Sequence, residues 1–166
     1  FWAVAMAWAA EGARVVVNDY GVSLDGTTPN AKVAQVVANE ILSSGGTAVA
    51  IAERVTTMAG GKRIVQAALD NWGRVDGVAC VAGILRKAAL FEMTEEQWDA
   101  VIETHLKGTF TIFRAATEAM RGQKCGALVG FAADGFAGHI AHPNYSAAKG
   151  GIVSLVRSAA LVMAPY

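Results

Sequence analysis

The stretch Glu11-Gly12-Ala13-Arg14-Val15-Val16-Val17-Asn18-Asp19 places a turn glycine, a run of valines and an acidic residue in direct succession. Consecutive β-branched residues are typical of a strand that is buried on both faces, as the strands of a parallel sheet are. Residues 2–10, just before this stretch, are rich in alanine and predict a helix, which Gly12 ends. The chain therefore begins with a helix, a turn and a buried strand that ends at a carboxylate.

Outward from this stretch, helix and strand continue to alternate. Apolar residues recur at helical spacing after Pro29, which suits the first position of a helix, and the pattern stops at Gly45-Gly46. Thr94 and Gln97 match a capping box and predict the start of a long helix. Further predicted helices cover residues 64–72 and 144–163, and further predicted strands cover residues 47–51, 75–81 and 126–131. This alternation favours a single α/β domain, residues 1–166, with a doubly wound parallel sheet between two helical layers.

The long helix after Thr94 carries large apolar side chains at helical spacing. If the helix runs without interruption, its buried face consists of Trp98, Val101, Ile102, Leu106, Phe110 and Phe113. The aromatic members of this set are predicted to lie either in the core or in a contact between subunits.

The composition is that of one globular domain and argues against several classes of function. The 166 residues are 54% hydrophobic and 17% charged, and 14 basic residues balance 14 acidic ones. No net charge attracts nucleic acid or an anionic membrane, so neither is an expected partner. Cys80 and Cys125 lack Cys-x-x-Cys spacing, which argues against a zinc site or a disulfide framework. A reducing, cytoplasmic location is expected.

Neither apolar segment near the ends of the chain predicts a membrane span. Residues 1–8 lack a basic flank and are too short to cross a bilayer. The segment Ile152–Met163 contains Arg157 and is predicted to be a buried helix. Because the sequence begins at Phe1 rather than at a methionine, we expect it to be part of a longer protein.

One pair of side chains in the last predicted helix suits acid/base chemistry. Within Asn144-Tyr145-Ser146-Ala147-Ala148-Lys149, Tyr145 and Lys149 are four residues apart and project from the same helix face. A phenol is a poor base at neutral pH until a nearby positive charge stabilises its phenolate form, and Lys149 supplies such a charge. The pair can then exchange a proton with an alcohol or a carbonyl oxygen. The same spacing also occurs on ordinary solvated helix faces, so the pair alone does not establish this chemistry.

Residues at the carboxyl ends of the predicted strands are candidates for ligand binding, because ligands of parallel α/β sheets bind at that edge. Asp19 ends the first strand; it either binds an adenosine ribose, repelling a 2′-phosphate, or is a solvated turn residue. Ala82-Gly83 ends the third strand, where the glycine either admits a ligand to the backbone or serves as a plain turn residue. The sequence contains no G-x-G-x-x-G turn, and Gly60-Gly61-Lys62 lacks the remaining residues of a P-loop.

Several stretches, in order, resemble the short-chain dehydrogenase/reductase family over nearly the whole chain. They are Glu11–Asp19, Gly73-Arg74-Val75-Asp76, Ala82-Gly83-Ile84-Leu85-Arg86, His105-Leu106-Lys107-Gly108-Thr109-Phe110 and Asn144–Lys149. Asn18-Asp19, Leu85-Arg86 and His105-Leu106 are most similar to the dehydrogenase module of multifunctional β-oxidation enzymes and to their bacterial single-domain relatives. The resemblance implies an incomplete Rossmann-like domain, whose first strand and glycine-rich turn are absent from this chain.

The resemblance also implies an activity. Hydride would pass between a nicotinamide cofactor and a carbon bearing an alcohol or a ketone, with a 3-hydroxyacyl thioester as a candidate substrate. Tyr145 would be the general acid/base, and Lys149 would stabilise its phenolate and bind the nicotinamide ribose. His105 replaces the family's catalytic asparagine and would relay protons. The family commonly assembles through its long helices, so a homodimer or homotetramer is implied as well.

The cofactor implied by the resemblance is NAD, with NADP less favoured. Asp19 would hold the adenosine ribose, and Ala82 and Gly83 would line the cofactor channel. Glu53, together with the backbone of Val55, would contact the adenine.

Departures from the family pattern fall at the expected site. The family's substrate-orienting serine is Ala132 here, which has no hydroxyl, and Asp134 or Ser146 could replace it. Cys80-Val81 replaces two asparagines near the cofactor, and Glu53 stands where the family has the shorter aspartate. These departures leave an alternative open, a relative without catalytic activity that acts as a binding or partner subunit.

Two further histidines precede the tyrosine. His139 and His142 are expected to be surface or substrate-cleft residues rather than metal ligands. The loop that selects the substrate in this family would follow Met163, outside these residues, so the sequence does not identify the substrate.

Overall fold

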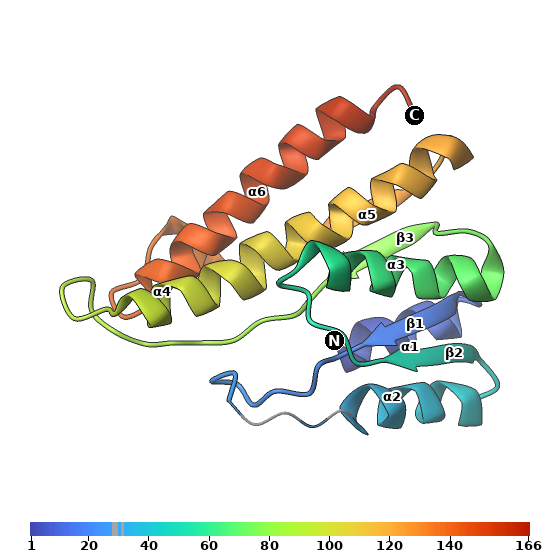
Figure 1. Ribbon diagram of the computed structural model, residues 1–166, viewed down its shortest axis with the longest axis horizontal. Helices are drawn as coiled ribbons and strands as arrows, with labels where there is room; N and C mark the ends of the chain where they lie inside the picture. The colour runs from blue at the N-terminus through green and yellow to red at the C-terminus, as the bar shows by residue number, and fades with distance from the viewer. Residues whose placement is uncertain (28–29, 31) are drawn as a thin grey trace.

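The computed structural model describes residues 1–27, 30 and 32–166, and in it helices and strands alternate as predicted (Figure 1). The strands are β1 (Arg14–Asn18), β2 (Thr47–Ile51), β3 (Gly77–Cys80) and β4 (Ala127–Gly130). The helices are α1 (Trp2–Ala10), α2 (Lys32–Ser43), α3 (Met58–Trp72), α4 (Glu95–Ile102), α5 (Gly108–Gln123) and α6 (Pro143–Met163), with a π-helical turn η1 (Glu103–Lys107) and a 3-10 turn η2 (Asp134–Ala137). Pro29, predicted to open the second helix, lies outside the described residues.

Local signals in the sequence set both ends of α3 and the start of α4. The predicted capping box is confirmed, because Thr94 Oγ1 accepts the Gln97 N–H and Gln97 Oε1 accepts the Thr94 N–H. Helix α3 begins earlier than predicted, since Thr57 caps it by accepting the Gly60 N–H at 3.0 Å. The segment Gly60-Gly61-Lys62 therefore lies inside the first turns of a helix. Gly73 ends that helix in the left-handed conformation, with φ +72°.

The four strands form two separate parallel pairs. β1 pairs with β2, and β3 pairs with β4. The predicted parallel arrangement is thus confirmed, but within the described residues no strand joins β1 to β3. The division into two pairs agrees with the predicted absence of the first strand, which would pair with the inner edges of both β1 and β3.

A cavity of about 1020 Å³ separates the two pairs and runs along the whole length of β1 and β3. A five-residue strand fills about 800 Å³, from a rise of about 3.3 Å per residue, a spacing of about 4.8 Å between strands and about 10 Å between layers. The cavity is therefore large enough for one more strand. Helix α1 packs against β1, and a short turn connects the end of the helix to the start of the strand. The other end of the helix, at Phe1, therefore lies level with the carboxyl end of β1 (Figure 1).

Helices pack on the strand pairs from several directions. α1 and α2 pack on β1 and β2, and their core includes Val15, Val17 and Ile41. α3 packs on β1 and on α5, which in turn packs on β3, while α6 packs on β4 (Figure 1). This packing brings the carboxyl ends of the strands and the first turns of α4 and α6 to the same end of the molecule.

The long helix predicted after Thr94 is interrupted by the π-helical turn η1. A π turn holds one residue more than an α turn, so the residues after it are rotated by about 100° relative to an uninterrupted helix. Val101 and Phe113 are buried as predicted, at 0% and 3% exposure, but Phe110 is 45% exposed. Trp98 is 38% exposed as well, so the prediction of a single inner face is wrong for both aromatic residues.

Helix α6 differs from its prediction in its second half. Ile152 is buried, but Leu161 and Val162 are 81% and 67% exposed, so the segment is not a buried helix throughout. By length and composition alone, α6 is long and apolar enough to cross a membrane. Its first half instead packs against α4, η1, η2 and β4, with Asn144 and Lys149 buried there. The exposed half projects past these neighbours along α5 (Figure 1).

Candidate active site

Helix α6 holds Tyr145 and Lys149 side by side. The Lys149 side chain is buried, and its Nζ lies 5.3 Å from the centre of the Tyr145 ring. Nζ also donates a hydrogen bond of 2.6 Å to the backbone oxygen of Phe131, at the end of β4. Burial lowers the pKa of Lys149 below its ordinary value. A buried cation is thus fixed beside the phenol ring, as the predicted pairing requires.

His105 is the third member of this cluster and comes from η1. Its ring lies 5.1 Å from the Tyr145 ring, at an interplanar angle of 88°. Its Nε2 lies 2.9 Å from the backbone oxygen of Ile84 and 3.2 Å from the Ile84 backbone nitrogen, so the tautomer decides which bond forms. Nδ1 is buried and has no partner among the described residues. The imidazole therefore lies edge-on to the phenol with one ring nitrogen unbonded.

Burial controls the charge of His105. Burial lowers the pKa of His105 to about 4. The backbone hydrogen bond with Ile84 acts in the opposite direction and raises the pKa, while the positive charge of Lys149 lowers it by a smaller amount. The imidazole is therefore neutral at neutral pH.

Gly83 is needed where it packs against His105. A Cβ built on Gly83 would lie 2.4 Å from Cε1 of the imidazole, too close for any side chain. The missing side chain thus makes room for His105. This role of Gly83 adds to the two that the sequence suggested, namely admitting a ligand to the backbone or forming a plain turn. The Thr109 hydroxyl donates to the His105 backbone oxygen at 2.7 Å, which ties the backbone of η1 to the first turn of α5.

Of the seven residues predicted to bind the cofactor, all but Tyr145 and Lys149 line a single cavity, the one that separates β1 from β3. Its lining includes Asp19, Glu53, Val55, Ala82 and Gly83, which follow the carboxyl ends of three strands. The lining continues to Thr104 and Thr109, which flank His105. The acid/base cluster therefore adjoins the cavity, although Tyr145, Lys149 and His105 are not part of its wall.

Polar side chains fasten the carboxyl ends of β1 and β2 to each other. The Asn18 amide accepts the Glu53 N–H at 2.9 Å and donates to the Glu53 backbone oxygen at 3.2 Å. Asp19 Oδ1 accepts the Gly21 N–H at 2.6 Å, which closes the turn after β1. Glu53 forms a two-point ion pair with Arg63, with bonds of 2.6 and 2.7 Å, and the Arg63 hydrogen bond lowers the pKa of Glu53. The Glu53 carboxylate is thus directed toward α3, while its backbone N–H and carbonyl oxygen are both bonded to the Asn18 side chain.

The part of the cavity between β1 and β3 is the room for one strand described above, and the residues around its other part, beyond the carboxyl ends of the strands, fit a nicotinamide dinucleotide. The cavity has a carboxylate, Asp19, at the turn where a ribose would bind, and its wall leads to the buried, unbonded Nδ1 of His105.

The residues that depart from the family pattern also lie here. Ala132 follows Phe131, whose carbonyl binds Lys149, and its side chain is exposed. Asp134 Oδ1 accepts the Gly135 N–H at 2.8 Å, whereas the buried Ser146 hydroxyl has no partner within the described part of the chain. Burial raises the pKa of Cys80 to about 12, so this thiol stays protonated and unreactive.

The two histidines before Tyr145 continue the row of rings. His139 and His142 have ring centres 4.5 Å apart, and His142 lies 6.4 Å from the Tyr145 ring. Burial, followed by the charges of His139 and Lys87, lowers the pKa of His142. Over residues 1–27, 30 and 32–166, no group of three or more histidine, cysteine or carboxylate side chains comes together to hold a metal.

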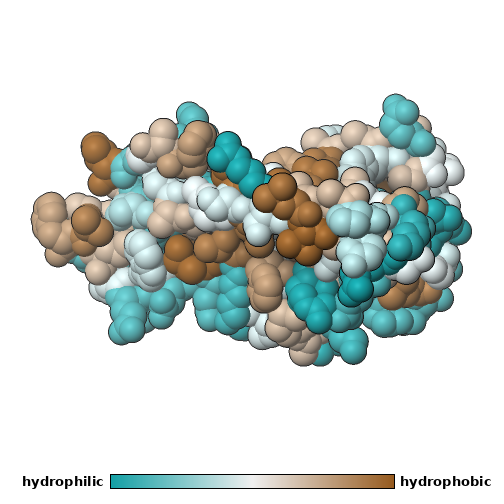
Figure 2. Space-filling view, turned by 90° about the horizontal axis from the view of Figure 1, so that it is seen from above, coloured by the Kyte–Doolittle hydropathy of each residue, from teal (hydrophilic) through white to brown (hydrophobic). Residues whose placement is uncertain are grey.

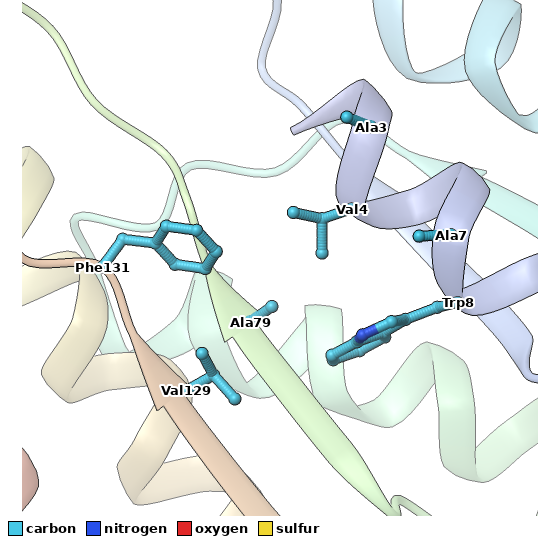
Figure 3. A pocket seen from close by; sticks show the side chains of 7 residues that line it. All are labelled: Ala3, Val4, Ala7, Trp8, Ala79, Val129 and Phe131. Atoms are coloured by element: carbon cyan, nitrogen blue, oxygen red, sulfur yellow. The ribbon is translucent and has the colours of Figure 1, made fainter.

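A second, smaller cavity of about 360 Å³ lies between α1 and the neighbouring face of β3 and β4 (Figure 3). Val4 and Trp8 point from α1 toward Ala79, Val129 and Phe131. Its lining side chains are apolar apart from the Trp8 indole nitrogen, so it offers no group for acid/base chemistry.

Sequence reasoning missed three residues that shape the site. The backbone of Ile84 binds His105, and Gly135 lies beside Tyr145, where a Cβ would be in ordinary van der Waals contact with the ring at 3.4 Å. Asn144 is fully buried and binds three backbone groups, although the sequence suggested only that it belongs to the tyrosine motif. The signal available for Asn144 was its place directly before Tyr145.

Comparison with known proteins agrees with this geometry. Residues 2–166 match the family model of the short chain dehydrogenases. A short-chain type dehydrogenase/reductase of Mycobacterium tuberculosis is 42% identical over 163 residues, which are 98% of this chain and 57% of that protein. The peroxisomal hydratase-dehydrogenase-epimerase of Saccharomyces cerevisiae is 41% identical over 163 residues, which are 98% of this chain and 18% of that protein.

A solved structure is similar as well. The crystal structure of a short chain dehydrogenase from Mycobacterium avium matches with a TM-score of 0.86 and 40% identity, over 96% of this chain and 57% of that one. The chain thus spans little more than half of the mycobacterial relatives and a smaller share of the multifunctional enzyme. The predicted resemblance, including the one to multifunctional enzymes, is confirmed. With a family model that matches from Trp2 to Tyr166, the chain belongs to the short-chain dehydrogenase family.

Proposed function

We propose that this chain carries the acid/base residues and part of the cofactor site of an NAD-dependent oxidoreductase, which transfers hydride between nicotinamide and a secondary alcohol or ketone. One observation carries the proposal. The Tyr145 ring centre lies 5.1 Å from that of His105 and 5.3 Å from Lys149 Nζ, and the three residues adjoin a cavity at the carboxyl ends of the strands. Ligands of parallel α/β sheets bind at that edge.

When bound, the nicotinamide supplies or accepts the hydride, and residues of this chain handle the proton. In the oxidation direction, the Tyr145 oxygen takes the hydroxyl proton while the carbinol hydrogen leaves as hydride. In the reduction direction, the phenol gives its proton to the carbonyl oxygen. Lys149 supplies a positive charge 5.3 Å from the ring centre. His105, neutral and with Nδ1 unbonded, can accept a proton and pass it on.

NAD is proposed as the cofactor in preference to NADP. Asp19 lines the cavity at the carboxyl end of β1, where a carboxylate binds ribose hydroxyls and repels a 2′-phosphate. Replacing Asp19 with serine should weaken the binding of NADH and narrow the difference in affinity between NADH and NADPH. Quenching of cofactor fluorescence measures both affinities. Equal binding of NADH and NADPH by the unaltered chain would contradict the preference.

The proposed substrate is a 3-hydroxyacyl thioester or a related secondary alcohol. The similarity to multifunctional enzymes whose names include a dehydrogenase supports this class. The stretches Leu85-Arg86 and His105-Leu106, which resemble the β-oxidation branch, lie next to each other, since Ile84, directly before Leu85, binds His105.

A second candidate function is a binding or partner subunit without turnover. Ala132 favours it, because one missing donor at a reacting oxygen costs about 3 to 4 kcal/mol, or about 100- to 1000-fold in rate. Cys80-Val81, in place of two amide side chains, favours it as well. Tyr145, Lys149 and Asp19 favour the oxidoreductase.

One experiment distinguishes the two candidate functions. NADH consumption with a 3-oxoacyl thioester is measured for the unaltered chain and for Ala132→Ser. The oxidoreductase proposal predicts measurable consumption that Ala132→Ser raises by about 100-fold or more. If the serine variant consumes no NADH and NADH does not bind, the chain is a non-catalytic relative.

Assembly into a homodimer or homotetramer through α5 and α6 is also proposed. Phe110, Leu161 and Val162 are exposed on these helices, and Figure 2, seen from the side of α6, shows hydrophobic residues along this face. Leu161→Glu should lower the assembled mass in light scattering, while Leu42→Glu, at an exposed leucine of α2, should not. A monomeric unaltered chain would contradict the proposal.

The proposed location is the cytoplasm. Its support is that Cys80 and Cys125 are both free thiols, as a reducing compartment allows. Fluorescence microscopy of the tagged protein checks this location, and a signal confined to another compartment would contradict it.

A further inference from the structure

Asn144 is fully buried at the first turn of α6, directly before Tyr145. Its Nδ2 donates to the backbone oxygens of Arg86, at 3.1 Å, and Gln97, at 2.9 Å. Its Oδ1 accepts the Tyr145 N–H at 2.8 Å. These partners fix the orientation of the amide, because a flipped amide would face two carbonyl oxygens with its own oxygen. One side chain thus joins α6, α4 and the segment after β3.

We propose that Asn144 is the positioning residue of Tyr145, which rests on the acid/base role proposed above. Its amide holds the backbone of Tyr145 at a fixed place relative to the segment 84–86. Asn144 itself touches neither substrate nor cofactor and acts through the residue that follows it.

The segment 84–86 serves as a common support for both rings of the site. Ile84 binds the imidazole of His105 through its backbone, and Arg86 binds Asn144 through its carbonyl oxygen. His105 and Tyr145 come from different elements, yet both are anchored to this one short stretch. Their edge-to-face contact, at 5.1 Å and 88°, follows from that shared anchorage.

Loss of the amide would release this arrangement. In an Asn144→Asp variant, a carboxylate oxygen replaces the Nδ2 amide group and its two N–H donors. This oxygen cannot donate a hydrogen bond, so it faces the backbone oxygens of Arg86 and Gln97 as a third acceptor. The first turn of α6 must then shift away from segment 84–86, and Tyr145 shifts with it. Misplacement of a reacting group by about 1 Å costs about 100-fold in rate.

The test compares Asn144→Asp with Asn71→Asp. Asn71 is an exposed residue of α3 whose amide also donates to a backbone oxygen, that of Ala67 at 2.8 Å, so its variant makes the same chemical change far from the site. The chain has three tyrosines, so ¹³C labelling of tyrosine rings gives a signal for each in NMR, assigned with Tyr→Phe variants. Asn144→Asp should shift the Tyr145 ring signal and leave those of Tyr20 and Tyr166 in place. Asn71→Asp should move none of them.

Kinetics provide the second readout, in the chain that also carries Ala132→Ser. Asn144→Asp should lower kcat by about 10- to 100-fold with a much smaller change in KM, because a positioning residue acts on the reacting group. The NMR readout needs no activity, so a shifted Tyr145 signal in a chain without turnover would contradict the proposed function and support the positioning role.

Two results would overturn the proposal. One is a folded Asn144→Asp chain whose Tyr145 ring signal is unchanged. If that variant does not fold, Asn144→Ser, which keeps one donor and adds no charge, is read in the same way. Failure of both variants to fold would make Asn144 a residue of general stability and not of tyrosine positioning.

Discussion

At His105, burial and not a charged partner decides the protonation state. The pKa of the native imidazole is about 4, against an ordinary value of 6.5, so the unfolded chain takes up a proton at higher pH than the native chain. The stability that neutral His105 contributes is therefore complete above about pH 6.5 and is lost as the pH falls toward 4.

The prediction is that the unaltered chain loses about 2 kcal/mol more unfolding free energy between pH 7 and pH 5 than His105→Asn does. Urea unfolding followed by circular dichroism at the two pH values measures the difference. His139→Asn, at an exposed histidine, should retain the pH dependence of the unaltered chain. Equal losses in His105→Asn and the unaltered chain would show that the imidazole is not buried in its neutral form.

The site residues that the sequence predicted and those that it missed differ in how far apart along the chain their contact partners lie. Tyr145 and Lys149 are one helical turn apart, so their proximity follows from helix geometry alone. Asn144 binds backbone groups 58 and 47 positions away, and no periodicity in the sequence encodes such a contact. The Glu53–Arg63 ion pair was missed for a related reason, because it depends on how α3 lies against the end of β2.

At the scale of secondary-structure elements, α3 and α5 approach each other closely at Gly61. A Cβ on Gly61 would lie 2.8 Å from the backbone carbon and oxygen of Thr111, so the two helices must separate to admit it. The same contact carries the hydrogen bond of 2.6 Å from the Thr111 hydroxyl to the Val55 backbone oxygen. Val55 lines the cofactor cavity, so the packing of these helices reaches the site.

Gly61→Ala should therefore lower the unfolding free energy by about 1 to 3 kcal/mol, the usual cost of overpacking. Gly122→Ala is the matched control, since it adds the same methyl group to a helix with no neighbour within 4 Å. The control should gain about 0.5 to 1 kcal/mol from its better helix propensity. Urea unfolding measures both, and a stabilised Gly61→Ala chain would contradict the close helix contact.

Element boundaries were predictable where a single residue type forces them. The left-handed Gly73 and the capping box at Thr94 were read correctly, because only a few residues suit those positions. The π turn was not predicted, since its residues, Glu103-Thr104-His105-Leu106-Lys107, have no composition that differs from an α-helix. It matters for function, because it places His105 against segment 84–86.

For the whole molecule, the main structural feature is the separation of the two strand pairs. The facing edges of β1 and β3 line the cavity of about 1020 Å³, and both strands point their carboxyl ends the same way (Figure 1). A parallel strand placed there would end beside Phe1 and could turn into α1. The alternation of helix and strand predicted the layers, and the absent first strand explains why the sheet divides.

We predict that extending the chain before Phe1 by a five-residue β-branched strand and a glycine-rich turn raises the unfolding free energy. Each buried side chain contributes about 1.5 to 3 kcal/mol, against about 1 to 2 kcal/mol of backbone entropy per residue. Hydrogen exchange should slow at the amides of β1 and β3. The same extension with a central proline, which has no N–H, should gain less, and equal gains would exclude a paired strand.

The central claim is that Tyr145 exchanges a proton with a substrate oxygen while nicotinamide exchanges a hydride with the adjacent carbon. Single-turnover transfer of deuterium from C4-deuterated NADH to a 3-oxoacyl thioester, followed by mass spectrometry, tests it most directly. We predict deuterium on the new carbinol carbon with the Ala132→Ser chain, and at least about 100-fold slower transfer when Tyr145→Phe is added. Transfer at the same rate without the tyrosine hydroxyl, or no transfer in either chain, would contradict the account.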